Sequence, residues 1–365
     1  MSSNWFRWAP AAAVPAVVAV GLVVSGAAAT PPPSPASAEQ VLALLAAHRS
    51  QQFSGEVEQR TDLGLPSIPS KALGSDAAAS STAAALDLLT SAHTARVYAD
   101  GPTKLRVQVM DQLAERDVVR NGTTAWTWDS STRRATRTTL PAASGSGVTG
   151  PVSPDSMAPD TLTPDALAQR FLAAVGPSTT VTVGEPVTVA GHGAWTLVLT
   201  PRTSGTLVGS VHIAVESTTG LPLAVDVYAK GQTDPAFHVA LTSLDLRAPD
   251  PSVFSFTPPA GATVTQQQLP TSSHFSHPLT PAKQQAAKAK AAKLAATGPR
   301  WDAVTVIPAA RVPGDLARSP LVAQLATPVP GGRLLSTSLV NVLLTDDGRV
   351  ITGAVPASTL EAAAR

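Results

Sequence analysis

The period of the hydrophobic pattern changes once near the start of the chain. Val41, Leu44 and Leu45 recur at helical spacing after Ser37 and Gln40, whose S-x-x-Q arrangement is that of a capping box at a helix N-terminus. Beyond this helix, apolar residues recur at every second position, which is typical of strands with one buried face. The pattern therefore predicts one short helix followed by a β-rich body.

The β-rich body divides into two runs of strands around a second helix. Asn121-Gly122 predicts a tight hairpin in the first run, and Thr163-Pro164 predicts the N-terminus of the helix. Strands separated by short turns such as Thr219-Gly220 indicate one large antiparallel sheet, curled or closed. The expected strands are 53–59, 105–109, 125–128 and 133–139, then 181–183, 187–189, 195–199, 211–215, 223–227 and 237–241.

The N-terminal segment has the pattern of an export signal. One arginine, Arg7, precedes the uncharged stretch Ala11–Ala29, which ends in small residues. This pattern indicates a secretory signal peptide, and an uncleaved N-terminal membrane anchor is the alternative, because about 20 apolar residues can span a bilayer. Both alternatives for residues 1–30 place the rest of the chain outside the cytoplasm, either secreted or anchored to the membrane.

The remainder of the chain divides into a large unit, a linker and a small unit. The large β unit covers 37–264, and 265–299 is a linker rich in lysine, alanine and glutamine. The unit at 300–365 contains Asp346-Asp347-Gly348, which predicts a hairpin turn. A unit of this length is marginally stable alone, so we expect it to dock on the large unit or on a partner.

Composition removes several classes of function. The chain has 365 residues and no cysteine, so disulfides, thiolate metal sites, thiol catalysis and lipid attachment at cysteine are excluded. A net charge of +1 gives no field that would steer the protein toward nucleic acid. No nucleophile elbow, zinc-binding helix motif, phosphate loop or dinucleotide fingerprint occurs, so we expect neither an enzyme nor a cofactor or metal.

The order of short motifs across 37–264 resembles the LolA-like superfamily, which includes the lipoprotein carrier LolA and the RseB/MucB N-terminal-like sensor domains. The alanine-rich composition and the C-terminal appendage are similar to actinobacterial members. The motifs are Phe53-x-Gly55-x-x-x-Gln59, Lys104-Leu105-Arg106, Val118-x-x-Asn121-Gly122-x-x-x-Trp126-x-Trp128-Asp129, Ala194-Trp195-x-Leu197-x-Leu199-Thr200-Pro201, Thr219-Gly220-Leu221-Pro222-Leu223 and Phe254-x-Phe256-x-Pro258-Pro259-x-Gly261.

This resemblance implies a mainly β (α+β) fold, an unclosed antiparallel β-barrel of about eleven strands. Helices would plug its mouth, and a small C-terminal α/β appendage would follow. Arg106 lies where the carriers place an arginine that latches the lid helices to the barrel. The apolar members of the strands would form a hydrophobic lining for a ligand. They are Leu105, Val107, Val109, Trp126, Trp128, Trp195, Leu197, Leu199, Val211, Ile213, Val215, Leu223, Val225, Val227, Phe237, Val239 and Leu241.

The resemblance implies an extracytoplasmic, non-enzymatic carrier that shields the acyl chains of a lipid or lipoprotein inside the half-barrel. The alternative is an envelope sensor or regulatory interaction module, like RseB/MucB, that binds a membrane protein. The expected partners are therefore acyl chains or a membrane protein, and not nucleic acid.

Overall fold

The computed structural model describes residues 37–48, 52–65, 92–110, 115–140, 163–173, 176, 178–268, 300–312 and 325–365. The expected signal segment at 1–30 and the linker from 269 to 299 lie outside the described residues. No helix within the described ranges is long and apolar enough to cross a membrane.

Two helices belong to the large unit, and their termini follow the sequence signals. Helix α1 spans Ala38–Ala47 and helix α3 spans Pro164–Ala173. The predicted capping box is confirmed, because the Gln40 backbone N–H donates to Ser37 Oγ at 3.2 Å and the Ser37 N–H donates to Gln40 Oε1 at 2.8 Å. At α3, the Ala166 N–H donates to Thr163 Oγ1 at 3.2 Å, which caps the helix.

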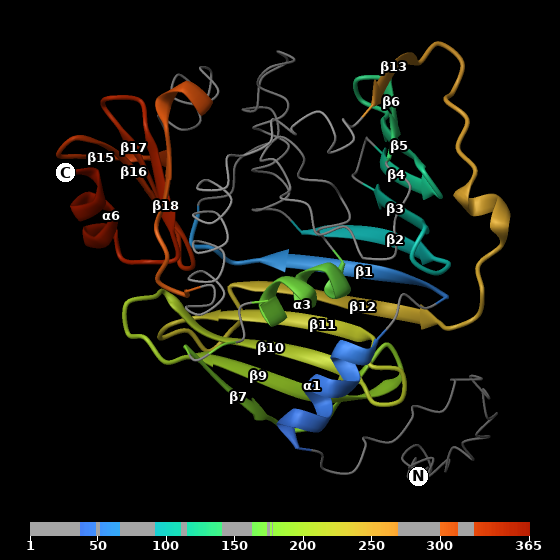
Figure 1. Ribbon diagram of the computed structural model, residues 1–365, viewed down its shortest axis with the longest axis horizontal. Coiled ribbons are helices and arrows are strands. Elements are labelled where there is room, and N and C mark those ends of the chain that lie inside the picture. The colour runs from blue at the N-terminus through green and yellow to red at the C-terminus, as the bar shows by residue number, and fades with distance from the viewer. Residues whose placement is uncertain are drawn as a thin grey trace, which may run out of the picture.

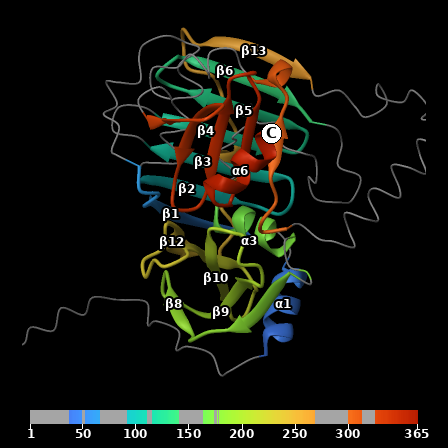
Figure 2. The same ribbon diagram turned by 90° about the vertical axis from the view of Figure 1, so that its left-hand side faces the viewer.

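A large open sheet of 13 strands forms the body of the molecule (Figures 1 and 2). Twelve strands run in the order β13-β6-β5-β4-β3-β2-β1-β12-β11-β10-β9-β7, and β8 pairs with β9. The expectation of a large, mainly antiparallel sheet that does not close is confirmed. The strands are β1 Phe53–Thr61, β2 His93–Ala99, β3 Lys104–Met110, β4 Glu115–Asn121, β5 Thr124–Asp129, β6 Arg134–Thr139, β7 Thr179–Val183, β8 Val187–Val189, β9 His192–Pro201, β10 Val208–Glu216, β11 Pro222–Ala229, β12 Phe237–Asp245 and β13 Thr263–Gln268.

The last strand departs from the expectation of a fully antiparallel sheet. After β12 the chain passes through a 3₁₀ turn, η3 (Pro251–Phe254), and returns along the sheet as β13. Strand β13 pairs with β6 in parallel, from Thr263 opposite Arg134 to Gln268 opposite Thr139. The start of the expected linker, 265–268, is therefore a strand, because the free edge of β6 offers backbone groups that pair with it.

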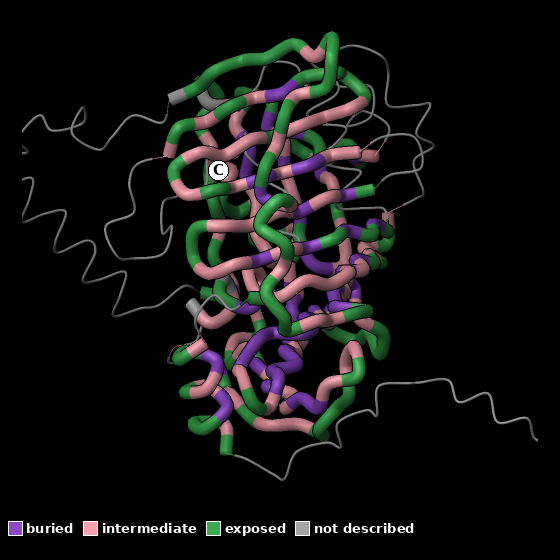
Figure 3. Tube along the Cα trace, turned by 90° about the vertical axis from the view of Figure 1, so that its right-hand side faces the viewer, coloured by how far each residue is buried: buried purple, intermediate pink, exposed green. Residues whose placement is uncertain are grey.

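One face of the sheet, which we call the inner face, carries an apolar core under the two helices. Val57, Val97 and Val107 on one side join Val225 and Val239 on the other in a single buried cluster. Buried and more exposed positions alternate along the strands (Figure 3), as the period-two pattern predicts. Helix α3 packs against β11 and β12, and α1 packs against β7 and β9 (Figure 1).

A close approach of backbone fixes the position of α1. The turn between β10 and β11 contains Gly220 with φ +76°, as the Thr219-Gly220 signal predicts. A Cβ atom at Gly220 would lie 2.5 Å from the carbonyl oxygen of Leu44 in α1. Glycine therefore allows both the left-handed backbone and the contact between helix and turn.

The small C-terminal unit has its own five-stranded sheet, with the order β14-β18-β17-β16-β15 (Figure 2). Helix α6 (Ala357–Ala364) packs on one face, where Leu334, Leu343, Ile351 and Leu360 form a second buried cluster. Gly348, at φ +83°, makes the predicted turn before β18. The elements are β14 Thr305–Ile307, the 3₁₀ turn η5 Ala309–Arg311, β15 Thr327–Val329, β16 Gly332–Ser336, β17 Asn341–Thr345 and β18 Val350–Gly353.

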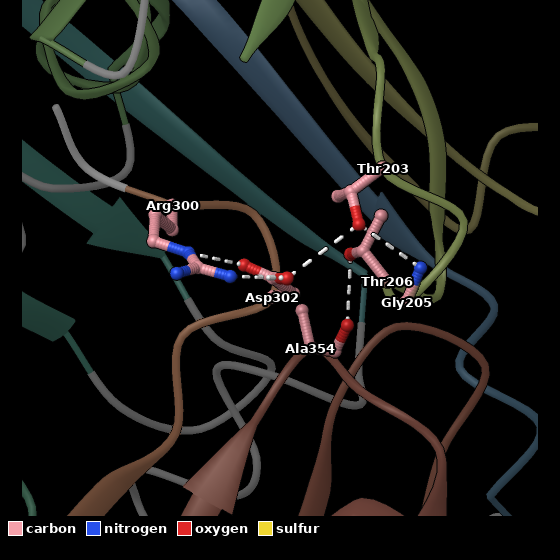
Figure 4. A network of polar contacts seen from close by, with 6 residues as sticks. All are labelled: Thr203, Gly205, Thr206, Arg300, Asp302 and Ala354. Carbon is pink, nitrogen blue, oxygen red and sulfur yellow. Dashed lines mark hydrogen bonds and ion pairs between the residues drawn. The ribbon is translucent and has the colours of Figure 1, made fainter. Parts of the chain in front are cut away.

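The C-terminal unit docks on one end of the large sheet. The Thr206 hydroxyl and the Leu207 N–H both donate to the Ala354 carbonyl at 2.8 Å. Beside this contact, Arg300 pairs with Asp302, and the Thr203 hydroxyl donates to Asp302 Oδ2 at 3.5 Å (Figure 4). The turn at 203–207 is therefore a shared structural element of both units.

Trp301 anchors the start of the C-terminal unit in the core of the large unit. The side chain is buried, and its ring stacks on Phe171 of α3 with centroids 6.2 Å apart and planes 14° from parallel. Its Nε1–H donates to Thr179 Oγ1 at 2.8 Å. One residue thus connects the C-terminal unit to the helix α3 that covers the inner face.

We expect Trp301→Ala to lower the free energy of unfolding by about 3–5 kcal/mol, because it leaves a cavity under α3. Trp301→Phe is the matched control. It keeps a stacked ring and loses the hydrogen bond, so it should cost clearly less. Denaturant unfolding of the full chain measures both. Equal stability of Trp301→Ala and wild type would contradict the anchoring role.

Candidate ligand-binding site

A cavity of about 220 Å³ lies between the inner face and the facing ends of the two helices. Its sheet side is mostly apolar, and Leu221 and Pro222 at the start of β11 contribute to it. The end of α1 and the first turn of α3 border it from above. The lining residues are His48, Phe53, Val57, Val97, Ala99, Gly101, Pro102, Lys104, Leu105, Arg120, Thr163, Pro164, Asp165, Ala166, Leu221, Pro222 and Leu241.

Two polar side chains reach the cavity from the helices, and each has one buried atom without a hydrogen-bond partner among the described residues. His48 has a side chain only 3% exposed, and its Nδ1 has no hydrogen-bond partner. Asp165 Oδ1 is buried and likewise lacks one, and it lies 4.0 Å from His48 Nε2. Buried polar atoms are rarely left without partners. The cavity therefore offers polar groups that a ligand atom or a water molecule can satisfy.

One basic side chain, that of Arg120, lies on the sheet side of the cavity. Arg120 Nε donates to the Gly122 carbonyl at 3.3 Å. Lys104 borders the cavity too, but its ammonium lies over the Phe254 ring of η3 on the other face of the sheet. In the register of β3 and β4, Leu105 lies opposite Arg120 and Val109 lies opposite Arg116. The inner face is therefore apolar at β3 and carries Arg116 and Arg120 at β4. The cavity lies at this boundary, because Arg120 lines it.

Most of the predicted lining residues do lie on the inner face, although few of them reach the cavity. Leu105 and Leu241 line it. Trp195 and Phe237 are partly buried against the core. The remaining aliphatic residues are buried within the same core cluster: Val107, Val109, Leu197, Leu199, Val211, Ile213, Val215, Leu223, Val225, Val227 and Val239.

Trp126 and Trp128 do not belong to this face, which corrects their place in the predicted lining. Strand register places Trp126 opposite Val119, and Val119 opposite Arg106, so all three share the outer face. Both tryptophan rings pack against Phe256, with centroids 5.5 and 6.4 Å apart. The returning segment after β12 packs on both rings and leaves them half-buried.

Arg106 also lies on the outer face, on the side of the sheet opposite α1 and α3, and its contacts here are with Asp117 and η3 and not with the helices. Its guanidinium makes two hydrogen bonds to the Asp117 carboxylate, at 3.2 and 2.6 Å, and donates to the Val253 carbonyl at 3.0 Å. Burial raises the pKa of Asp117, and the hydrogen bonds from Arg106 oppose that rise. The arginine therefore fastens η3 to the sheet.

Sequence reasoning missed the polar members of the cavity. His48 is the residue that caps the C-terminus of α1, and Asp165 follows Pro164 in the first turn of α3. Nothing in the local pattern brings two helix ends together when six of the thirteen strands separate them in sequence. The Leu221-Pro222 turn was identified only as a link between strands.

No family model matches the chain, and no curated protein matches it. Similar solved structures include the MucA/MucB complex of Pseudomonas aeruginosa, at 18% identity and a TM-score of 0.44, covering 90% of this chain and 96% of that one. A LolA superfamily protein from Nitrosomonas europaea is similar at 12% identity and a TM-score of 0.24, covering 61% and 99%. An outer membrane lipoprotein-sorting protein domain from Vibrio parahaemolyticus is similar at 9% identity and a TM-score of 0.22, covering 57% and 91%.

A double-mutant cycle tests the role of Arg106. Removing one partner of a buried ion pair leaves the other charge unpaired, so Arg106→Leu and Asp117→Leu should each cost about 3–5 kcal/mol, and the double variant clearly less than their sum. Urea unfolding gives these values. Arg247→Leu is the control, because its pair with Asp245 is exposed and should contribute little. A latch role would instead show as faster amide exchange confined to α1 and α3 in Arg106→Leu.

Proposed function

We propose that this protein is an extracytoplasmic, non-enzymatic binding protein that shields an acyl chain of a lipid or lipoprotein between its inner face and the helices α1 and α3. The observation that carries the proposal is the cavity at the helix ends. An apolar wall forms its floor, and buried polar atoms of His48 and Asp165 at its helical side lack hydrogen-bond partners. This combination suits a ligand with an apolar chain and a polar end.

The size of the cavity determines how such a ligand would enter. Small-molecule sites usually measure about 300–1,000 Å³, and this cavity of about 220 Å³ is smaller. A whole acyl chain therefore requires α1 and α3 to move away from the sheet. The contact between His48 and Asp165, at 4.0 Å, is longer than a hydrogen bond and offers little resistance to that movement.

The binding energy would come from burial of methylene groups. Each buried CH₂ contributes about 0.8 kcal/mol, so a chain that displaces the helices and covers the apolar inner face can reach useful affinity. Part of this gain is offset by the loss of contacts that Val41 and Leu45 of α1 now make with the core. The bound form thus exchanges helix contacts for ligand contacts on the same surface.

A substitution that fills the cavity tests the proposal. Ala166 lines the cavity from α3, whereas Gln169 on the same helix is exposed. We expect Ala166→Trp to weaken binding of a fluorescent fatty acid at least about tenfold, a loss of about 1.4 kcal/mol. Gln169→Trp, which adds the same ring to the outer surface of α3, should bind like wild type.

Native mass spectrometry of full-length protein purified without detergent provides the second measurement. Bound lipid is expected in the wild type and should be reduced in Ala166→Trp. Wild-type protein that is free of lipid and also takes up no fluorescent fatty acid would refute the proposal. Equal binding by both tryptophan variants would refute the assignment of the site to this cavity.

A second candidate function is that of a regulatory interaction module for a membrane protein. The observation that favours it is the face of the C-terminal sheet opposite α6. Strand register places Ile307, Leu335, Val342 and Leu344 together on that face, half-buried. Among the described residues, none of the four packs in either core cluster. An apolar face of this kind suits a protein partner.

Crosslinking in membranes distinguishes this candidate. We expect the wild type to capture one specific membrane protein, and the Leu335→Lys/Leu344→Lys variant to lose it while it still binds the fatty-acid probe. Val340→Lys is the control, because Val340 is exposed in a loop of the same unit. Absence of a reproducible crosslinked membrane protein with the wild type would count against an interaction role.

A further inference from the structure

A second pocket lies on the outer face of the large sheet, on the side opposite α1 and α3. It is an open depression of about 470 Å³ at the ends of β9, β10 and β11. Its walls are the turn after β9, at 201–204, and the turn after β11, at 230–232. The pocket borders the 203–207 turn that carries the C-terminal unit and shares no residue with the inner cavity.

The floor of this pocket is a row of polar side chains on neighbouring strands. Ser210 and His212 project from β10, and the Ser210 hydroxyl lies 3.1 Å from His212 Nε2. Tyr228 of β11 contacts the imidazole, with ring centroids 4.6 Å apart. Burial lowers the pKa of His212, and the nearby charge of Asp226 opposes that effect. The floor therefore offers neutral hydrogen-bonding groups and the faces of two rings.

The rim of the pocket is basic. Lys230 Nζ donates to the Ser204 carbonyl at 2.9 Å and to the Thr203 carbonyl at 3.4 Å, which holds the ammonium over the turn. Arg202 Nε donates to Thr180 Oγ1 at 3.1 Å, and its other N–H groups have no partner among the described residues. Both side chains are exposed, and among the described residues both keep donors that no partner occupies.

The lining of this pocket carries no aspartate or glutamate among the described residues, although carboxylates lie close to it. Asp226 lies opposite His212 in the register of β10 and β11, and it is paired with His238. Burial raises the pKa of Tyr228, and the charges of Asp226 and Asp234 add to that rise. A pocket lined by two cations and several hydroxyls, with no carboxylate in the lining itself, suits an anion whose other groups can also form hydrogen bonds.

We propose that this outer pocket binds a phosphate ester that carries hydroxyl groups, with the phosphoryl oxygens between Arg202 and Lys230 and the hydroxyl-bearing part over Ser210, His212 and Tyr228. The same chemistry occurs in soluble phosphate esters and in the glycerol phosphate head group of a lipid. The proposal is independent of the acyl-chain site, because the two pockets lie on opposite faces of the sheet.

Calorimetric titration of the full-length protein tests the proposal with three probes. The probes are glycerol 3-phosphate, inorganic phosphate, and vesicles of phosphatidylglycerol mixed with phosphatidylcholine. We expect glycerol 3-phosphate to bind more tightly than inorganic phosphate, because only the ester reaches the polar floor. Binding of the vesicles as well would identify a lipid head group as the source, and binding of the soluble ester alone would identify a soluble metabolite.

Variants assign the binding to this pocket. Arg202→Gln/Lys230→Gln should weaken binding of the ester at least about tenfold, because two charge-assisted contacts are lost. Ser210→Ala should reduce affinity for the ester while leaving the weaker binding of inorganic phosphate unchanged. The control is Arg247→Gln, an exposed arginine beyond the opposite end of β12, which should bind like wild type.

Three results would overturn the proposal. They are the absence of binding by any probe, equal affinity for inorganic phosphate and the ester, and equal loss of binding in the Arg247 control and the double variant. The fatty-acid probe is measured on the same double variant. If this variant binds the fatty acid normally but no longer binds the phosphate ester, the outer pocket and the acyl-chain site are independent. The result for one proposal then does not decide the other.

Discussion

Burial of the apolar inner face is the constraint on which the rest of this structure depends. Thirteen strands in a sheet that does not close leave a wide apolar surface that neither the sheet nor its edges can cover. Helices α1 and α3 cover this surface, and Gly220 lets α1 closely approach the turn between β10 and β11. Where the two helix ends meet, the cover is incomplete, and the cavity with His48 and Asp165 results.

The outer face of the sheet is covered at one end and left open at the other. Beside β3–β6, the returning segment with η3 covers Trp126, Trp128 and Val119, and the Arg106–Asp117 pair fastens it. At the ends of β9–β11, no segment among the described residues fills the outer surface. The polar pocket with Ser210 and His212 lies there. The same sheet can therefore present an apolar site on one face and a polar site on the other.

Trp301 gives the C-terminal unit a direct mechanical link to the cover of the inner face. It belongs to the C-terminal unit in sequence, yet it packs in the core of the large unit against Phe171 of α3. A movement of α3 that admits a ligand would disturb this stack. The two candidate functions, shielding of an acyl chain and binding of a membrane protein, are thus physically compatible within one chain.

The sequence by itself determined the local structure. Period-two alternation identified the strands, and Ser37, Thr163, Gly122 and Gly220 identified helix starts and turns, because these depend on neighbours only a few residues apart. Only the tertiary structure decided which side of each strand lies on the inner face of the sheet and which lies on the outer face. Alternation fixes that Trp126 and Arg106 lie on one side of their strands, but only the pairing register decided that this side is the outer one. The parallel β13, the cavity between distant helix ends and the Ser210–His212 floor arise from contacts between remote segments, which no local pattern encodes.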